Sequence, residues 1–580
     1  MDIEKKIAAA AGRLKADTLF INGKIIDVFT GRIINENLAV KNGYFCGFGD
    51  YEAEKIIDLK SRYISPGFVD AHVHIESSMV TPAEFAKAVL PLGTTSVIAD
   101  PHEIANVLGI DGIEFMMRSA DTQLMNILFA FPSCVPATSM ETSGAILDAE
   151  KIKPMLFNDR IIALAEMMNY PGVIFTDPDV MAKIKECRNV RKPVDGHAPG
   201  LTGKELAAYA AGGILSDHEC TNAKEAMEKM SLGMHIMIRE GTCAKNLSNL
   251  LPAVNDQTWP CMMWCTDDRH PDDILNQGHI DHSIRKAVRS GIEPVRAIQM
   301  ATINPARYFN LNNIGAIAPG RRADFVVFQD LYDLRTKKVY TKGFLIGENG
   351  EFCLDSESTQ AAPVISSISS SVSYPESMNL DITTIDLSIP VQGKYIKVIE
   401  AVPYQVVTNK FVAEISEEHG FAVSDIKRDI LKIAVIERYS GDTGIGKGFI
   451  KGFGLLRGAI ASSVAHDSHN IIVAGTNDTD MIKAVKTVKD MGGGFSVVCD
   501  NQITASLSLP VAGLMSEKPM AIIQRKMHKI TAAVKKLGSP LKDPFMTLGF
   551  LALPVIPKLK ITDKGLVDVE QFKIVNLFED

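Results

Sequence analysis

The feature that most constrains the fold is a regular alternation in the middle of the chain, where short apolar runs end in polar residues and lead into amphipathic stretches. These runs end at His72, Asp100, Ser133, Glu166, His197, His218, Arg239 and Asp267. Their mean spacing is about 28 residues, which is the length of one strand and one crossover helix. Over residues 67–306 the pattern predicts a (β/α)8 barrel whose active site lies at the C-terminal ends of the strands, where these polar residues fall.

Segments rich in β-type residues flank this region on both sides. Between residues 17 and 66, the runs 18–21 and 24–29 are separated by Asn22-Gly23, which is a strong signal for a β-hairpin. A similar run at 323–328 follows a turn at Pro319-Gly320. We therefore expect residues 17–66 and 307–355 to form one small, discontinuous β domain.

The last third of the chain follows a segment with the composition of a linker. Residues 356–379 are rich in serine and contain two prolines, which is typical of a linker. From 380 to 580 we expect an additional α/β domain. Its clearest part is a strand at 471–475, a helix that begins after Asn477, and a second strand at 495–499.

Composition excludes several classes of partner. Lys and Arg number 61 against 69 Asp and Glu, a net charge of −8, whereas a nucleic-acid-binding domain is normally basic. The chain does not open on the apolar segment of a secretory signal, and its least charged stretch, 122–140, is too polar to span a membrane. Nine cysteines without a repeated spacing do not suggest a disulfide framework. We expect a cytoplasmic protein with no nucleic-acid or membrane partner.

The strongest chemical signal is the pair His72 and His74. Two histidines at i and i+2 on a strand point to the same face, so both imidazoles can bind one metal ion. The motif alone is weak, because such a pair is as often a packed or surface pair as a pair of ligands. Here it closes the first apolar run of the barrel pattern, which favours the metal site.

Other strand ends carry further ligand-type side chains, namely His197, His218 and Asp267. Each alone is more often structural than functional, but their regular placement indicates that they converge at one mouth and hold one or two divalent metal ions. Glu166 closes an otherwise apolar run. It is either an exposed glutamate at a strand end or a carboxylate that bridges two metals about 3.5–4 Å apart.

Six motifs extend this pattern into a family resemblance. They are residues 72–79 (HVHIESSM), 100–103 (DPHE), 166–169 (EMMN), 195–200 (DGHAPG), 217–219 (DHE) and 266–269 (TDDR). Together they resemble the amidohydrolase superfamily and, within it, the bacterial adenine deaminase family. Residues 315–328 resemble the superfamily's returning β segment and residues 380–580 the extra C-terminal domain. The resemblance implies a metal-dependent (β/α)8 barrel with the two accessory domains described above.

The resemblance also implies a cofactor and a ligand set. It implies two divalent metal ions, with Mn²⁺ or Fe²⁺ favoured and Zn²⁺ as the alternative. The implied ligands are His72, His74, Glu166, His197, His218 and Asp267. Many amidohydrolases bridge their metals with a carboxylated lysine, and Glu166 stands in its place here.

The activity implied is the hydrolysis of adenine to hypoxanthine and ammonia, in which a metal-bridging hydroxide attacks C6. Glu219 is expected to donate a proton to the ring, and Asp267 to orient the hydroxide and pass its proton to the departing ammonia. The residues expected around the substrate are Glu76, Asp100, His102, Glu103, Asp268 and His469. We expect a homo-oligomer whose partner is a small molecule.

Three questions stay open on the sequence. The chain could be another binuclear amidohydrolase that acts on a cyclic amide or an N-acetyl substrate, or a non-enzymatic protein that kept the barrel and lost the metals. The segment 466–470 (HDSHN) is either a metal or substrate cluster or a polar loop before a strand. The C-terminal domain either covers the barrel mouth or is remote and serves oligomerisation.

Overall fold

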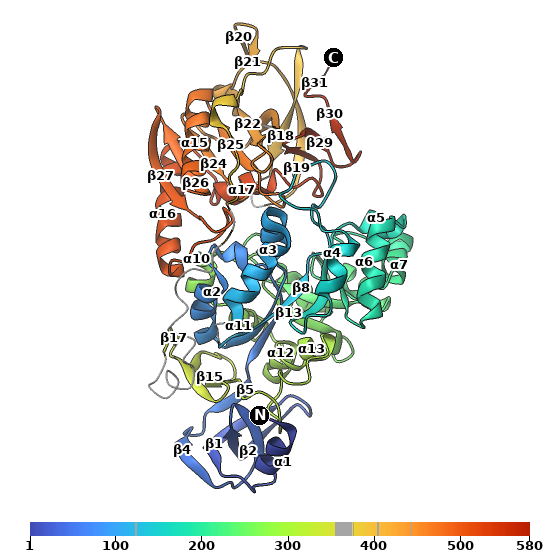
Figure 1. Cartoon of the computed structure of the whole chain (residues 1–580), viewed down its shortest axis with the longest axis vertical. Coiled ribbons are helices and arrows are strands. Elements are labelled where there is room, and N and C mark those ends of the chain that lie inside the picture. Colours follow the sequence, from blue (N-terminus) through green and yellow to red (C-terminus); the bar gives the residue numbers. More distant parts are fainter. Residues whose placement is uncertain (122–123, 354–373, 375, 403–404, 442–443, 580) are drawn as a thin grey trace.

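The structure, a computed structural model, describes residues 1–121, 124–353, 374, 376–402, 405–441 and 444–579. Most of the predicted serine-rich linker, 356–379, lies outside these residues. Along the long axis of the molecule, a β-rich end, an α/β middle and a second sheet with its helices follow one another (Figure 1). None of the helices in the described ranges combines the length and the apolar character that a membrane span requires.

Both flanks of the middle region contribute strands to one nine-stranded sheet, in the order β17-β16-β15-β14-β5-β1-β2-β3 with β4 paired to β1. The strands are β1 (Ala16–Asp27), β2 (Arg32–Lys41), β3 (Tyr44–Phe48), β4 (Ala53–Asp58), β5 (Tyr63–Pro66), β14 (Phe325–Phe328), β15 (Thr336–Thr341), β16 (Phe344–Glu348) and β17 (Glu351–Phe352). The two flanks meet where β5 pairs antiparallel with β14, with Pro66 opposite Phe325.

The hairpin predicted at Asn22-Gly23 is wrong. Residues 16–27 form the single strand β1, and both halves pair with β2 on either side of a register shift between Phe20 and Gly23. Asn22 has a φ of 54°. Asparagine tolerates this left-handed conformation better than most residues do, so the dipeptide makes a bulge in one strand instead of a turn between two.

The middle of the chain forms two parallel sheets that together curl around one axis. The orders are β10-β9-β8-β7-β6 and β11-β12-β13. The strands are β6 (Phe68–Val73), β7 (Thr94–Ala99), β8 (Asn126–Phe131), β9 (Ile161–Met167), β10 (Val194–Gly196), β11 (Ser216–Asp217), β12 (His235–Arg239) and β13 (Met262–Cys265). At one seam the Leu215 N–H donates to the Val194 carbonyl, and at the other the Asp267 N–H donates to the His72 carbonyl, each at 3.0 Å. The carboxyl ends of the strands therefore open on one side.

The sequences of these strands are continuous apolar runs because helices cover their outer faces, so both faces of the sheet are buried. Both β7 and β9 are buried at every residue. The helices that follow the strands include α2 (Pro82–Val89), α3 (His102–Asp121), α4 (Ala149–Met155), α6 (Pro178–Asn189), α7 (Gly203–Ala211), α8 (Ala223–Ser231) and α11 (Ile280–Arg289).

The C-terminal region is built on a second nine-stranded sheet, in the order β19-β18-β23-β22-β25-β24-β26-β27 with β31 paired to β18. The strands are β18 (Tyr395–Ala401), β19 (Thr408–Glu414), β22 (Ile430–Ile436), β23 (Ile445–Lys451), β24 (Ala459–Ser462), β25 (Ile471–Gly475), β26 (Gly494–Cys499), β27 (Gln502–Ser508) and β31 (Phe578–Glu579). Its helices include α15 (Asp478–Asp490), α16 (Met520–Lys536) and α17 (Pro544–Phe550). The predicted strand–helix–strand at 471–499 is present as β25, α15 and β26.

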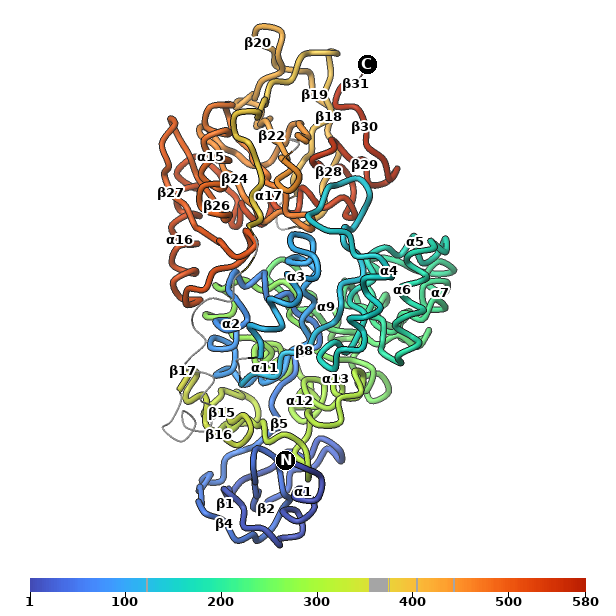
Figure 2. Tube along the Cα trace, in the orientation of Figure 1, coloured from blue at the N-terminus to red at the C-terminus, as the bar shows by residue number. Residues whose placement is uncertain are grey.

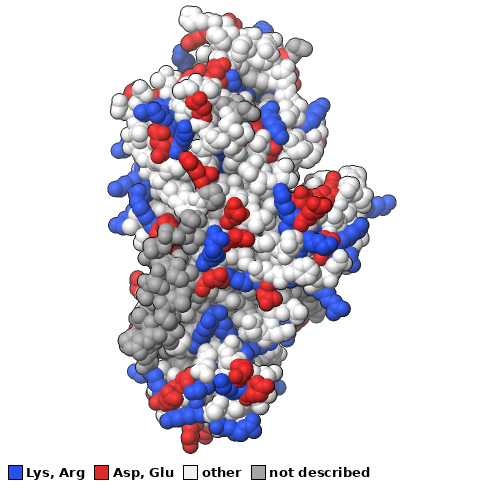
Figure 3. Space-filling model, in the orientation of Figure 1, with Lys and Arg blue, Asp and Glu red and all other residues white. Residues whose placement is uncertain are grey.

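The C-terminal region lies against the side of the middle region on which the strands end (Figure 2). The backbone of Ser516 pairs with the segment after β6, because its N–H donates to the Met79 carbonyl (3.0 Å) and its carbonyl accepts the Thr81 N–H (3.2 Å). The Thr562 hydroxyl donates to the Met140 carbonyl at 2.6 Å. On the face drawn in Figure 3, basic and acidic side chains are interspersed.

Candidate functional site

His72, in β6, and His74, which follows it, point into the mouth of the curled sheet, and their Nε2 atoms face each other at 3.1 Å. The Nδ1 atom of His74 lies 3.0 Å from the Asp100 carbonyl oxygen. Because a carbonyl can only accept, Nδ1 carries the proton and leaves Nε2 free to bind a metal. Asp267 Oδ1 lies 3.1 Å from Nε2 of His72 and 3.0 Å from Nε2 of His74.

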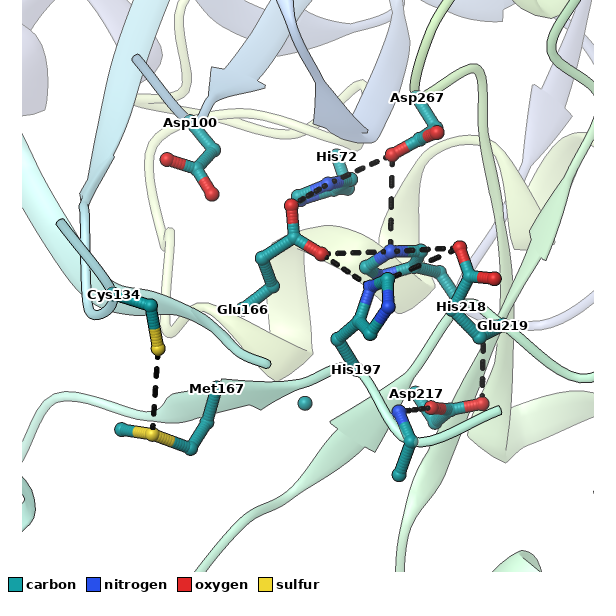
Figure 4. Close-up of polar contacts among 12 residues, drawn as sticks. His72, Asp100, Cys134, Glu166, Met167, His197, Asp217, His218, Glu219 and Asp267 are labelled. Atoms are coloured by element: carbon teal, nitrogen blue, oxygen red, sulfur yellow. Dashed lines mark hydrogen bonds and ion pairs between the residues drawn. The ribbon is translucent and has the colours of Figure 1, made fainter. Parts of the chain in front are cut away.

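Glu166 stands at the centre of the cluster, between His72 on one side and His197 and His218 on the other (Figure 4). Its Oε1 lies 3.2 Å from His74 Nε2 and 3.7 Å from His72 Nε2. Its Oε2 lies 2.6 Å from His197 Nδ1 and 3.2 Å from His218 Nε2. One carboxylate oxygen thus faces each pair, which is the arrangement that a bridging ligand requires.

The cluster is buried, and its charges are strongly coupled. Burial would raise the pKa of Glu166, but the imidazoles of His218 and His197 hold that pKa well below its usual range. Burial lowers the pKa of His218, but the carboxylate of Glu166 outweighs it and raises that pKa to about 9. Positive charge beside these carboxylates is therefore energetically favourable, whether it comes from protonated imidazoles or from a bound cation.

The residues fit a divalent metal. His72, Glu166, His218 and Asp267 offer ligand atoms that all lie within 4.8 Å of one another, and so do His72, His74, Asp100 and Glu166. Among the described residues, His218 Nε2 is a buried atom that makes no well-directed hydrogen bond, although Glu166 Oε2 lies 3.2 Å away. Buried polar atoms are rarely left in this state, and a cation between the two would satisfy both. Imidazole and carboxylate ligands without a thiolate suit manganese, iron or zinc.

Arg239, at the end of β12, organises the acidic side of the cluster. Its guanidinium contacts the carboxylates of Glu219 and Asp267 and lies 3.1 Å from Asp268 Oδ2. Glu219 Oε1 is held 3.5 Å from His218 Nε2. Arg239 belongs to the series of strand-end residues in the sequence, but the sequence did not reveal its role, since a cation is not a metal ligand.

The other predicted substrate-binding residues line the same mouth. Asp100 accepts the backbone N–H of His102 at 3.1 Å, and the His102 ring brings its Nδ1 to 3.5 Å from Glu166 Oε1. Glu76 Oε1 accepts the Ile104 N–H at 3.2 Å. Asp268 accepts the hydroxyl of Ser77 at 2.6 Å.

Glu103 and His469 meet in a second cluster beside the first. The loop between β24 and β25 brings His466 Nδ1 to 3.1 Å from Glu103 Oε1, and His469 Nε2 to 3.8 Å from Glu103 Oε2. His102 Nε2 lies 3.8 Å from Asp467 Oδ1. The C-terminal region therefore reaches the mouth through residues 466–470, and His469 faces Glu103 and not the central histidines.

Beneath the cluster, Lys229 joins two of its loops. This fully buried residue donates to the Ala198 carbonyl (2.7 Å), Asp217 Oδ2 (3.0 Å) and Glu225 Oε1 (2.9 Å). Ala198 follows His197 and Asp217 precedes His218, so one ammonium group fixes the spacing of both histidines. The sequence could not reveal this role, because Lys229 lies on α8 with the periodicity of an ordinary amphipathic helix.

Two family models match the chain. The amidohydrolase family matches residues 63–347, and the adenine deaminase C-terminal domain matches residues 405–573. The chain is similar to the adenine deaminase of Desulfatibacillum aliphaticivorans, at 48% identity over 99% of this chain and 100% of that protein. It is also similar to the adenine deaminases of Methanothrix thermoacetophila, at 48% over 100% of both, and of Bacillus pumilus, at 43% over 98% of both.

Solved structures share a weaker likeness. A β-aspartyl dipeptidase from Fervidobacterium islandicum AW-1 is 16% identical, with a TM-score of 0.45, over 58% of this chain and 98% of that one. An adenosine deaminase from Xanthomonas campestris with bound zinc is 14% identical, with a TM-score of 0.42, over 61% of this chain and 99% of that one.

Proposed function

The chain belongs to the adenine deaminase family, and we propose that its buried cluster of histidines and carboxylates is the site at which adenine is deaminated. It is a hydrolase that acts on C–N bonds. The reaction consumes adenine and water and yields hypoxanthine and ammonia. The observation that carries this proposal is whole-chain identity of 43–48% to adenine deaminases.

We propose that two divalent metal ions bind here, Mn²⁺ or Fe²⁺ in preference to Zn²⁺. The ligands are His72, His74, His197, His218 and Asp267, with Glu166 between the two sites. A divalent ion lowers the pKa of water from about 15.7 to about 7, which supplies a nucleophile at neutral pH. The support is the position of Glu166, with one oxygen towards each pair of histidines.

The protein's own groups would move the protons. Asp267 accepts one proton of the attacking water and passes it to the departing amine, and Glu219 carries the other to the ring nitrogen next to C6. Attack forms the C6–O bond and leaves C6 tetrahedral, and the C6–N bond then breaks, so the two protons of water end on hypoxanthine and ammonia. Arg239 supports this assignment because it holds both carboxylates on one guanidinium.

The finer organisation is proposed on the same basis. The two seams between the parallel sheets support one closed (β/α)8 barrel over 67–306. The sheet shared by both flanks supports a small β domain made of 17–66 and 307–355, and the C-terminal domain would span 380–580. Glu76, Asp100, His102, Glu103, Asp268 and His469 would surround the base. We also propose that the protein is a cytoplasmic homo-oligomer without nucleic-acid or membrane partners.

Ammonia release tests the substrate. The purified chain, loaded with Mn²⁺, should release ammonia and hypoxanthine from adenine, and should act poorly on cyclic amides and N-acetyl compounds. Activity on one of the latter, with adenine left intact, would favour the other amidohydrolase function.

A glutamate variant tests the metal site. Glu166→Gln should lose bound metal and activity together, whereas Glu240→Gln, a buried glutamate paired with Lys286, should keep both. Full metal occupancy in Glu166→Gln would show that the bridge is misassigned.

A further inference from the structure

Asp467 is a buried carboxylate that the metal cluster does not use. It lies in the loop between β24 and β25 and is only 3% exposed. Its Oδ1 stands 3.8 Å from His102 Nε2 and 4.0 Å from His466 Nδ1, and its Oδ2 has no hydrogen-bond partner among the described residues. Burying a carboxylate without hydrogen bonds is costly, so a donor is missing at this point.

A second buried carboxyl group, that of Glu141, lies near Asp467, and its Oε2 lacks a hydrogen-bond partner among the described residues. Burial and the charge of Asp467 raise the pKa of Glu141 to about 8, so this carboxyl group is mostly protonated near neutral pH. A second negative charge beside Asp467 is therefore unfavourable, and a ligand that fits here carries an N–H group and no negative charge.

The distance from the metal cluster suits a small flat ligand. A single imidazole ring, that of His102, spans the gap, with Nδ1 3.5 Å from Glu166 Oε1 and Nε2 3.8 Å from Asp467 Oδ1. A purine that reacts at the cluster through its six-membered ring would bring its five-membered ring towards the loop if it lies alongside His102.

The neighbouring Glu103, His466 and His469 do not favour another metal there. The Ala465 N–H donates to His469 Nδ1 at 3.2 Å. That nitrogen is therefore an acceptor, and the proton of the neutral ring sits on Nε2. Nε2 is the atom that faces Glu103, and a protonated nitrogen cannot bind a metal ion.

We propose that Asp467 accepts a hydrogen bond from the imidazole N–H of adenine, so that the C-terminal region selects the free base over N-substituted purines such as nucleosides. The inference rests on the proposed function. A purine substituted at N7 or N9 lacks that N–H, leaves the buried carboxylate unpaired, and adds bulk against the loop. A site built to hydrogen-bond a substrate discriminates strongly against the analogue that cannot do so.

Methylated substrates test the proposal on the metal-loaded chain. For the wild type, kcat/KM for adenine should exceed that for 9-methyladenine and 7-methyladenine by about 100-fold or more. Asp467→Asn should lower kcat/KM for adenine by about 10- to 100-fold, mainly through KM, and change the values for the methylated bases little. Asp467→Ala should bring kcat/KM for adenine and for the methylated bases still closer together, because it makes room for the methyl group. Asp480→Asn is the control, since this buried aspartate on α15 accepts the Asn501 N–H far from His102.

The outcomes separate the two proposals. A wild-type chain that leaves adenine intact would refute the proposed function. A wild-type chain that deaminates adenine but treats the methylated bases equally, or Asp467 variants with an unchanged ratio, would overturn the role of Asp467. If Asp467→Ala fails to fold, the isosteric Asp467→Asn still decides, because it removes the carboxylate without changing the space for a methyl group. For the wild type, hypoxanthine should also bind at least about 10-fold more tightly than 9-methylhypoxanthine.

Discussion

Glu219 reaches the buried cluster of histidines and carboxylates from the residue next to His218, and Arg239 holds its carboxylate there. Replacing Glu219 with glutamine keeps the size of the side chain and removes its ability to carry a proton. We expect kcat to fall by about 10²- to 10⁴-fold, the usual contribution of a general acid–base group, while both metals stay bound. Steady-state kinetics and metal analysis of the same preparation measure both quantities.

A second substitution separates proton transfer from positioning. Arg239→Lys keeps the charge but cannot hold Glu219 and Asp267 with one planar group, so its kcat should fall less than that of Glu219→Gln. A Glu219→Gln enzyme within a few-fold of the wild type would remove this residue from the mechanism.

Lys560 gives a pH-dependent prediction away from the cluster of histidines and carboxylates. Its ammonium donates to the Val406 and Phe550 carbonyls, each at 2.8 Å, but burial lowers its pKa from 10.5 to about 7. The unfolded chain therefore binds this proton up to a pH of about 10.5, and the folded chain only up to about 7. The contribution of Lys560 to the free energy of unfolding should rise with pH between these values.

Denaturant unfolding measures this contribution as a difference between variants. In Lys560→Met the gain in stability with pH should be smaller than in the wild type between pH 7 and 9. The exposed neighbour Lys558→Met is the control and should follow the wild type. Parallel pH curves for Lys560→Met and the wild type would mean that Lys560 stays charged in the fold.

At the scale of elements, the sequence predicted best where several local signals agree. The strand–helix–strand at 471–499 combines apolar runs with the helix cap Asn477, whose side chain accepts the Asp480 N–H. The hairpin prediction at Asn22-Gly23 was wrong because it rested on one local signal. The dipeptide lies within a single strand, since β2 pairs with the residues on both sides of it.

Prediction of the site from the sequence was limited in the same way, because local signals do not show long-range partners. His72, His74 and Asp267 were recognisable because strand ends of a parallel sheet converge by topology. The role of Arg239 was not recognisable, and residues 466–470 stayed open between a metal or substrate cluster and a polar loop, because both depend on partners far along the chain. Asp467 meets His102 only after the C-terminal region has docked, and neither residue type signals that contact locally.

The loop at 466–470 is the element through which the C-terminal region meets the mouth. Its His469 is fully buried and accepts the Ala465 N–H, so it orders the loop as well as facing Glu103. We expect His469→Ala to lower the melting temperature and raise KM for adenine, because both the loop and its contact with Glu103 are lost. His528→Ala, an exposed histidine on α16, is the control. An unchanged KM would make this loop purely structural.

At the scale of the whole molecule, the middle and C-terminal regions share one core. A single cluster of buried apolar side chains includes Val97 and Trp264 from the middle and Leu431, Ile472 and Leu548 from the C-terminal region. Segments after β6 and β8 are also hydrogen-bonded to Ser516 and Thr562. A shared core makes unfolding of one region expose apolar surface of the other, so the two regions should unfold together.

Removal of the metals tests this coupling. If the proposed metal ions bind only the folded chain, chelation should lower its stability by about 3–4 kcal/mol relative to the chain at 100–1,000 times the metal dissociation constant. Both tryptophans, Trp259 and Trp264, lie in the middle region, so their fluorescence reports on that region alone. Circular dichroism reports on every helix and strand.

If the regions are coupled, chelation should shift the fluorescence and dichroism transitions by the same amount, although no predicted metal ligand lies beyond residue 267. A dichroism transition that stays in place while the fluorescence transition moves would show that the C-terminal sheet unfolds independently.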